Sequence, residues 1–253
     1  MRRLLPIVLL ALVVASCGGG SMDAAPTGLA DASSRTVAGD TANFTLVIRG
    51  TVAGVSVRSS ETGSLSFSDR HAHFYKLVPG GGLPQEIVLD GPWTYTNANV
   101  DAALADSSVK PWTKLDTRKV PTSDSKSHPD ELTHVRALAY LAGGVSDAKQ
   151  VGVTTVGGEK LTRYRGTVDP VQVVANAPAA ERSALRAAVR NDYLATPFPA
   201  DFWLDDAGRV RRVLVDYRTS GGGRVVVDGG FSDFGTKVDR TVPPAEDVQD
   251  ITP

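Results

Sequence analysis

The residue best placed for covalent chemistry in this 253-residue chain is Cys17, its only cysteine. Met1-Arg2-Arg3 gives the chain a cationic start, and the 11 residues 4–14 that follow are apolar. Small residues, Ala15 and Ser16, stand directly before the thiol. A charged start, a short apolar run and a small-residue cleavage site are typical of a secretory signal peptide. The cysteine therefore stands directly after the small residues, where such a peptide is cut.

The segment resembles the lipobox of bacterial lipoproteins. A transmembrane helix followed by an incidental cysteine is the alternative, but 11 apolar residues are too few, since about 20 are needed to span a bilayer. The resemblance implies that residues 1–16 are a signal peptide and that Cys17 becomes the acylated N-terminus, carrying chains such as palmitate. Residues 17–27 then form a linker rich in Gly, Ser and Ala. We therefore expect a protein anchored to the extracytoplasmic face of the cell membrane.

Other residue types that could do chemistry do not converge on a site. His71 and His73 stand two apart on one strand face, but no third ligand with suitable spacing is evident, so a solvated face is the better interpretation. There is no Gly-x-Ser-x-Gly elbow to present a nucleophile. The glycine runs 80–82 and 221–223 lack the Lys-Ser/Thr of a phosphate loop. We expect no enzyme activity, no metal and no cofactor.

Composition is that of a globular protein without a nucleic-acid partner. Hydrophobic residues make up 42% of the chain and charged residues 22%, which is enough for a sizeable core. Cleavage removes two of the 27 basic side chains, Arg2 and Arg3, and leaves 25 against 28 acidic ones. This weakly acidic balance provides no electrostatic footprint for nucleic acid. The mature body has no second cysteine, so its stability depends on core and sheet.

Alternating apolar and polar residues predict many strands with few helices between them. Three segments have helical spacing and helix-start residues, namely 27–38, 131–142 and 170–194, the last broken at Pro178. Period-two segments bounded by Gly, Asp and Ser predict strands at 43–49, 55–67, 74–77, 86–89, 93–96, 111–115, 148–156, 159–168, 201–204, 209–217 and 224–231. The order lacks a βαβ rhythm. It therefore predicts an α+β fold with one curved antiparallel sheet of about 10–11 strands and its helices on one face.

Five stretches carry a family resemblance, and together they span nearly the whole mature chain. They are residues 30–49, the strand 112–115, the hairpin 157–169, the segment 199–210, and Phe231 to Gly235 with Pro243 and Pro244 downstream. In this order they resemble the LppX/LprA/LprF/LprG group of actinobacterial lipoproteins, whose fold is related to the LolA and LolB carriers. The resemblance implies a half-barrel sheet wrapped over helices on its concave face. It places this LolA-like domain at residues 28–240, before a Pro-rich tail, 241–253, with little order.

The same resemblance implies binding of lipid rather than catalysis. Family members take up acyl chains in an apolar cavity between sheet and helices. We expect the partners to be a lipid or glycolipid with long acyl chains, the membrane, and an envelope transport protein, with lipid transfer or presentation by a monomer at the cell envelope. The alternative is a cell-surface protein-interaction or sensor module with no lipid cargo.

Strand alternation and helix faces give candidates for the cavity lining. They are Phe44, Leu46, Ile48, Val55, Val57, Leu65, Phe67, Leu138, Leu141, Leu185, Val189 and Phe202. Plain core packing is the competing interpretation for each of them. Arg182, Arg186 and Arg190 repeat every four residues on one helix and are candidates for lipid head groups, against a solvated helix face. Residues 97–129 have no family counterpart outside the strand at Trp112, and we interpret them as an insert that reshapes or covers the cavity mouth.

Overall fold

The computed structural model describes residues 27–52, 54–77, 83–120, 131–190, 196–218 and 223–253, so Cys17 lies outside the described residues. One open sheet of 12 strands runs through this part of the chain in the order β12-β6-β5-β4-β3-β2-β1-β11-β10-β9-β8-β7. Its strands are β1 Thr41–Val52, β2 Val55–Ser66, β3 His71–Leu77, β4 Gln85–Asp90, β5 Trp93–Thr96, β6 Trp112–Asp116, β7 Val145–Val156, β8 Glu159–Val168, β9 Phe198–Leu204, β10 Val210–Arg218, β11 Arg224–Ser232 and β12 Val248–Asp250.

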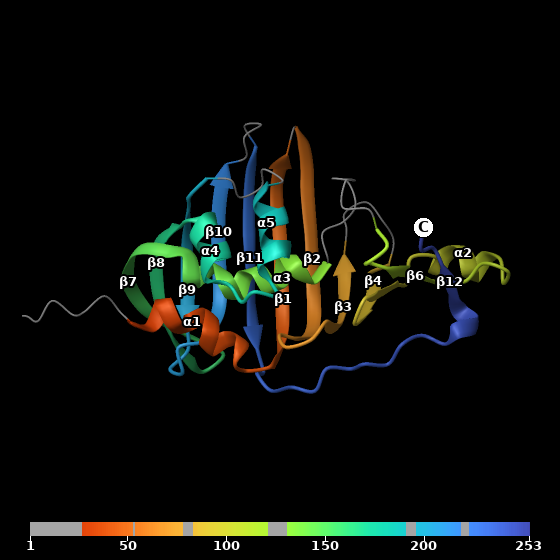
Figure 1. Ribbon diagram of the computed structural model, residues 1–253, viewed down its shortest axis with the longest axis horizontal. Helices are drawn as coiled ribbons and strands as arrows, with labels where there is room; N and C mark the ends of the chain where they lie inside the picture. Colours follow the sequence, from red (N-terminus) through yellow and green to blue (C-terminus); the bar gives the residue numbers. More distant parts are fainter. Residues whose placement is uncertain (1–26, 53, 78–82, 121–130, 191–195, 219–222) are drawn as a thin grey trace, which may run out of the picture.

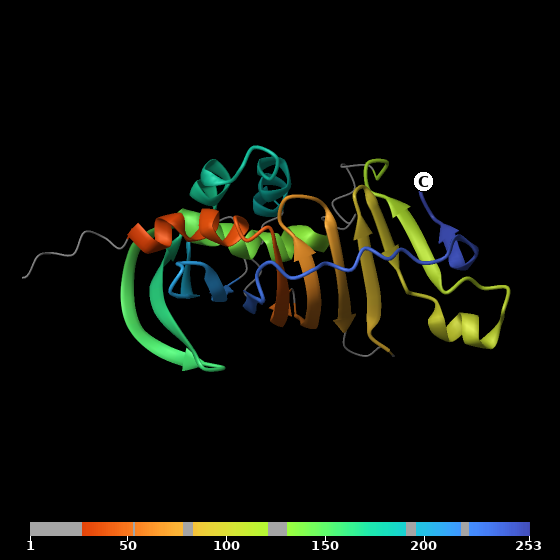
Figure 2. The same ribbon diagram turned by 90° about the horizontal axis from the view of Figure 1, so that it is seen from below.

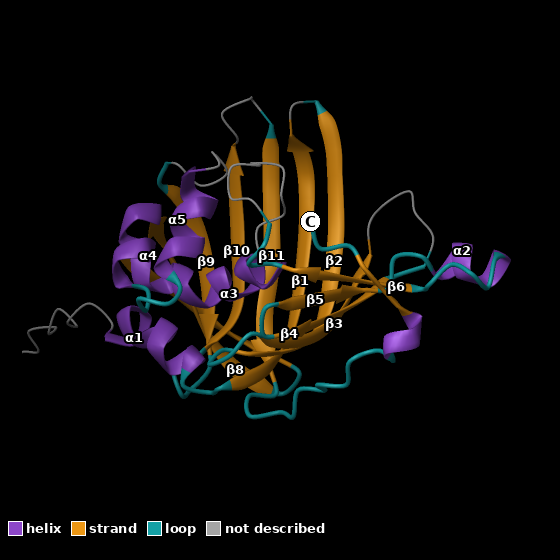
Figure 3. Ribbon diagram, turned by 45° about the vertical axis from the view of Figure 1, so that its right-hand side comes forward, coloured by secondary structure: helices purple, strands orange, loops and turns teal. Residues whose placement is uncertain are grey.

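Neighbouring strands are antiparallel except at one edge, where β12 pairs in parallel with β6. Figure 3 shows how strongly the sheet twists, because β3–β6 cross the direction of β1 and β2 at a large angle. Strand β1 joins the N-terminal and C-terminal parts of the chain in the middle of the sheet, since it pairs with β2 on one side and with β11 on the other. This is the curved α+β sheet predicted from the sequence, and that prediction is confirmed.

Four helices gather over one half of the sheet (Figure 1). They are α1 Thr27–Val37, α3 Glu131–Leu141, α4 Pro170–Asn176 and α5 Arg182–Arg190, with a 3-10 turn at Ala142–Gly144. Helix α2 Val100–Ala105 and the 3-10 turn Ala245–Asp247 lie at the other end of the sheet. Helices α1 and α3 lie against the strands, and α4 and α5 lie over α3 as a second layer (Figures 1 and 2). Asp169 caps α4 with its carboxylate, which accepts a hydrogen bond of 2.8 Å from the backbone N–H of Val171.

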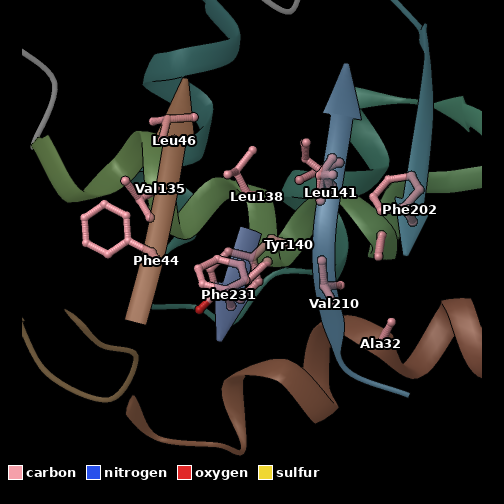
Figure 4. Close-up of a cluster of buried hydrophobic side chains, with 14 of the residues drawn as sticks. Ala32, Phe44, Leu46, Val135, Leu138, Tyr140, Leu141, Phe202, Val210 and Phe231 are labelled. Carbon is pink, nitrogen blue, oxygen red and sulfur yellow. The ribbon is translucent and has the colours of Figure 1, made fainter. Parts of the chain in front are cut away.

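The hydrophobic core fills the space between α1, α3 and the central strands. Phe44 and Leu46 of β1 point into it and are each 2% exposed, whereas Thr45 between them points to the other face. Figure 4 shows side chains from both layers, among them Val135 and Leu138 of α3, meeting over these strands. The sheet therefore has two different faces: a covered face beneath the helices, and an opposite face that carries the polar residues of the same strands.

Close backbone approach explains one glycine in the middle of β2. A Cβ added at Gly63 would lie 2.2 Å from the carbonyl oxygen of His73 on β3, and 2.4 Å from the Cβ of Phe74. Such distances are well inside van der Waals contact, so no larger residue fits without moving one of the two strands.

The structure corrects the predictions for two peripheral segments. Residues 241–253 were expected to have little order, but β12 adds its edge hydrogen bonds to β6, and Thr252 accepts a bond from the backbone N–H of Asp116. The expected insert, residues 97–129, supplies α2 and β6 at the far edge of the sheet (Figure 1). Its described part lies away from α4 and α5, and so does not cover the face beneath them.

Candidate functional site

The covered face gathers most of the residues that the sequence suggested for a lipid cavity. One contiguous cluster with the helices contains eight of them, all 5% exposed or less: Phe44, Leu46, Leu65, Phe67, Leu138, Leu141, Leu185 and Phe202. Ile48 is half-buried against the same cluster. The structure thus brings together side chains from three strands and two helices, with the apolar character that an acyl chain would require.

Three further candidates do not join this cluster. Val55 is 65% exposed and Val57 is half-buried, because both stand where the β1–β2 hairpin extends beyond the helical layer (Figure 1). Alternation along a strand fixes the face that a side chain lies on, but not whether another element covers it. The side chain of Val189 lies outside the described residues.

A buried polar group that the sequence analysis missed lies between α3 and the start of α5. Arg136 pairs with Glu181 at 3.1 Å between Nη1 and Oε1, with side chains 7% and 16% exposed. The same guanidinium donates to the backbone carbonyl of Phe67, at the end of the β2 strand. Burial, reinforced by the negative charge of Glu181, raises the pKa of the Tyr140 phenol to about 12. This group joins the second helical layer to the sheet through the apolar core.

The arginine row on α5 faces away from this buried group. Arg182 and Arg186 are exposed, and Arg182 donates from Nε to the carbonyl oxygen of Ala177 at 2.9 Å. The side chain of Arg190 lies outside the described residues. The described part of the row is thus a solvent-facing helix surface, and contact with lipid head groups stays a prediction.

The opposite face of the sheet is hollowed near the β7–β8 hairpin. Figure 2 shows this hairpin bending away from the helices, so that its turn lies below the other strands. Between the hairpin and the strands is a groove of about 750 Å³, within the usual size range of small-molecule pockets. Its lining comes from β7, β8, β9, β10, β11 and β1. Exposed apolar side chains stand on β7, and the charged ones stand on β8, β10 and β11.

A group of ion pairs stands next to this groove and includes one lining residue, Arg163. Asp201 accepts two hydrogen bonds from Arg163, at 3.2 and 3.0 Å, and two more from Arg165, both at 2.9 Å. Burial alone would raise the pKa of the Asp201 carboxyl, but these hydrogen bonds outweigh burial and hold the pKa below its usual value. Two guanidinium groups contact the ring of Trp203. The guanidinium carbon lies 5.1 Å from the ring centroid for Arg163 and 4.8 Å for Arg212.

The two strand histidines also lie on the opposite face, where each imidazole stands between two carboxylates. The distances are 2.9 Å from His71 Nδ1 to Asp69, 2.7 Å from His71 Nε2 to Asp90, 2.7 Å from His73 Nε2 to Glu86, and 3.5 Å from His73 Nδ1 to Asp239. Their side chains are 18% and 19% exposed, so this part of the expected solvated face is half-buried among carboxylates. Among the residues that the structure describes, no three His, Cys, Asp or Glu are arranged to hold a metal ion.

Known proteins are similar to this chain in fold but not in sequence. No family model matches the chain, and no curated protein is similar to it in sequence. Among solved structures, LprF from Mycobacterium bovis matches with a TM-score of 0.51 at 16% identity, over 85% of this chain and 95% of LprF. The Mycobacterium tuberculosis lipoprotein LppX matches with a TM-score of 0.50 at 14% identity, over 86% of this chain and all of LppX. The resemblance to the LppX/LprF group is therefore confirmed at the level of the fold.

None of the helices in the described ranges is long and apolar enough to cross a membrane.

Proposed function

We propose that this chain is a lipoprotein, anchored through acylated Cys17, that binds lipid acyl chains between its helices and the covered face of the sheet. The observation that carries the proposal is the likeness of fold, over 85% or more of the chain, to a protein that is itself a lipoprotein. The signal-like segment before Cys17 supports the same assignment independently of the fold.

The covered face supplies a physical route to lipid uptake. Leu138 and Leu141 of α3 and Leu185 of α5 belong to one buried cluster with the apolar strand residues Phe44, Leu46 and Phe202. When an acyl chain enters between the helices and the sheet, contacts between apolar side chains are replaced by contacts between these side chains and the acyl chain. The amount of apolar surface exposed to water therefore changes little. Displacement of α4 and α5, which form the outer layer, makes the necessary room.

Binding is reversible in this scheme, and no bond in the lipid is made or broken. Extraction of an acyl chain from a bilayer into the protein is close to neutral when the cavity is as apolar as the membrane. We therefore infer exchange or presentation of lipid at one membrane surface as the role of the protein.

Native mass spectrometry of residues 22–253, expressed in bacteria without the anchor, tests the proposal. We expect the protein to carry co-purified acyl lipid, or to take up added phospholipid, with a mass increase of one lipid molecule. A clean apo mass, with no uptake of added lipid, would overturn the proposal and favour a protein-interaction module. Leu138→Asp and Val171→Asp are a matched pair of variants, since Leu138 is buried in the covered face and Val171 on α4 is 63% exposed. Only Leu138→Asp should abolish binding.

A further inference from the structure

We propose that the groove beside the β7–β8 hairpin is a second binding site, for an amphiphile with one alkyl chain and an anionic head group. The groove is open to solvent on the opposite face of the sheet, so it is separate from the covered face and its helices. Its occupation does not depend on lipid binding beneath the helices.

The hairpin side of the groove provides the apolar wall. Val151, Val153 and Val156 of β7 line it and are 48%, 51% and 56% exposed. Leu161 of β8 and Trp203 of β9 lie behind them and are themselves buried. Val156 pairs with Glu159 and so lies on the same face of the hairpin as Leu161, whereas Val153 pairs with Thr162 and lies on the other face. An alkyl chain along this wall removes Val156 from water.

More arginines than carboxylates line the groove. The arginines are Arg163, Arg211 and Arg212, and the carboxylates are Glu159 and Asp228. Arg211 and Arg212 pair with these two carboxylates, whereas Arg163 pairs with Asp201, which stands outside the lining and is shared with Arg165. An anionic head group completes this array, since guanidinium donors bind phosphate and carboxylate oxygens in the same geometry.

The placement of the two walls gives the ligand its orientation. Arg163 and Arg212 flank the ring of Trp203, which stands where the charged strands meet the hairpin. A head group at Arg212 thus leaves the attached chain facing Leu161 and Val156. A zwitterionic or cationic head group would add a positive charge to an array that already has an excess.

Trp203 provides a direct readout, because Trp93 and Trp112 lie on β5 and β6 near the other edge of the sheet. In the Trp93→Phe/Trp112→Phe background, titration with a bromine-labelled dodecanoate should quench Trp203 in a saturable manner. Dodecyl phosphate should displace this probe, whereas dodecyl maltoside and dodecyltrimethylammonium should displace it at least about tenfold less effectively. Equal displacement by all three, or quenching that does not saturate, would overturn the proposal. So would equally effective displacement by inorganic phosphate alone.

Matched variants separate this groove from the covered face. Val156→Asp should weaken binding of the brominated dodecanoate about tenfold, because burial of one valine contributes about one decade of affinity. Val171→Asp, at a valine of α4 with similar exposure (63% against 56%), should not change it. Arg212→Gln should weaken binding, whereas Arg224→Gln, which breaks a similar exposed pair with Asp216, should not. Unchanged binding in both groove variants would refute the site, and lipid retained beneath the helices would show that the proposed function stands without it.

Discussion

Replacement of Glu181 by Gln should destabilise the protein by more than a substitution at an exposed helix position usually does, although Glu181 stands next to the exposed arginines of α5. The substitution preserves side-chain shape but leaves the Arg136 guanidinium, 7% exposed, without its carboxylate. Removal of one partner from a buried ion pair costs about 3–5 kcal/mol. Here Glu181 keeps some solvent contact, and Arg136 keeps its bond to the carbonyl of Phe67. We therefore expect a loss of about 2–3 kcal/mol in the free energy of unfolding.

Urea unfolding at pH 7 and a thermal melt measure this effect. A loss of that size should lower the Tm by about 5–10 °C in a domain of this length. Arg182→Gln is the matched control, because Arg182 is the next residue along and is exposed, and it should stay within about 0.5 kcal/mol of the parent. The double variant Arg136→Met/Glu181→Leu should recover most of the stability, since apolar side chains replace a buried pair at little cost.

Two outcomes would refute this reasoning. If Glu181→Gln has the stability of Arg182→Gln, the ion pair does not hold the second helical layer to the sheet. If the double variant is as unstable as the single one, the loss comes from packing and not from an uncompensated charge. The same variant also probes lipid exchange: weaker attachment of α5 should increase the rate of lipid uptake, provided that lipid enters beneath it.

Three further predictions concern stability at high pH, strand packing and the anchor. Unfolded Tyr140 ionises near pH 10 and folded Tyr140 near 12, so stability should fall between these values by about 2–3 kcal/mol, and Tyr140→Phe should remove that part of the fall in urea titrations at pH 9–12. Gly63→Ala should cost more than about 2 kcal/mol in urea unfolding, because its Cβ would meet the His73 carbonyl, whereas Ser64→Ala should not. Cys17→Ser should leave the folded domain unchanged but move it from the membrane to the soluble fraction and abolish labelling by a clickable palmitate analogue; retained labelling would contradict the anchor.

Local sequence patterns predicted the sheet because its strands obey local rules. The alternation of Phe44, Leu46 and Ile48 against polar neighbours matches the covered face of β1, and Asp169-Pro170 matches the start of α4. These sequence signals depend only on the strand or helix to which each residue belongs. They fail for β12, whose three residues have little apolar character and pair with β6 across more than 130 residues of chain.

The charged groups were not predictable, because their partners are set by the tertiary fold. The sequence pattern predicts only that Glu181 is a polar residue at the start of a basic helix. The fold, however, places it against Arg136, 45 positions earlier in the sequence. The arginines of the groove likewise read as the polar positions of alternating strands. Their ion pairs and their position beside Val156 of β7 arise from the order β11-β10-β9-β8-β7, which no local pattern encodes.

The geometry of the N-terminus connects the two proposed sites to the proposed anchor. Helix α1 begins at Thr27 beside β7, at the end of the sheet that carries the groove, whereas α2 and β12 lie at the other end (Figure 1). The ten residue steps between Cys17 and Thr27 span at most about 35 Å even when fully extended. An acylated Cys17 therefore keeps the β7–β8 end within a few nanometres of the bilayer. The proposed anchor thus favours exchange of cargo at this end of the sheet over exchange at the end that carries α2 and β12.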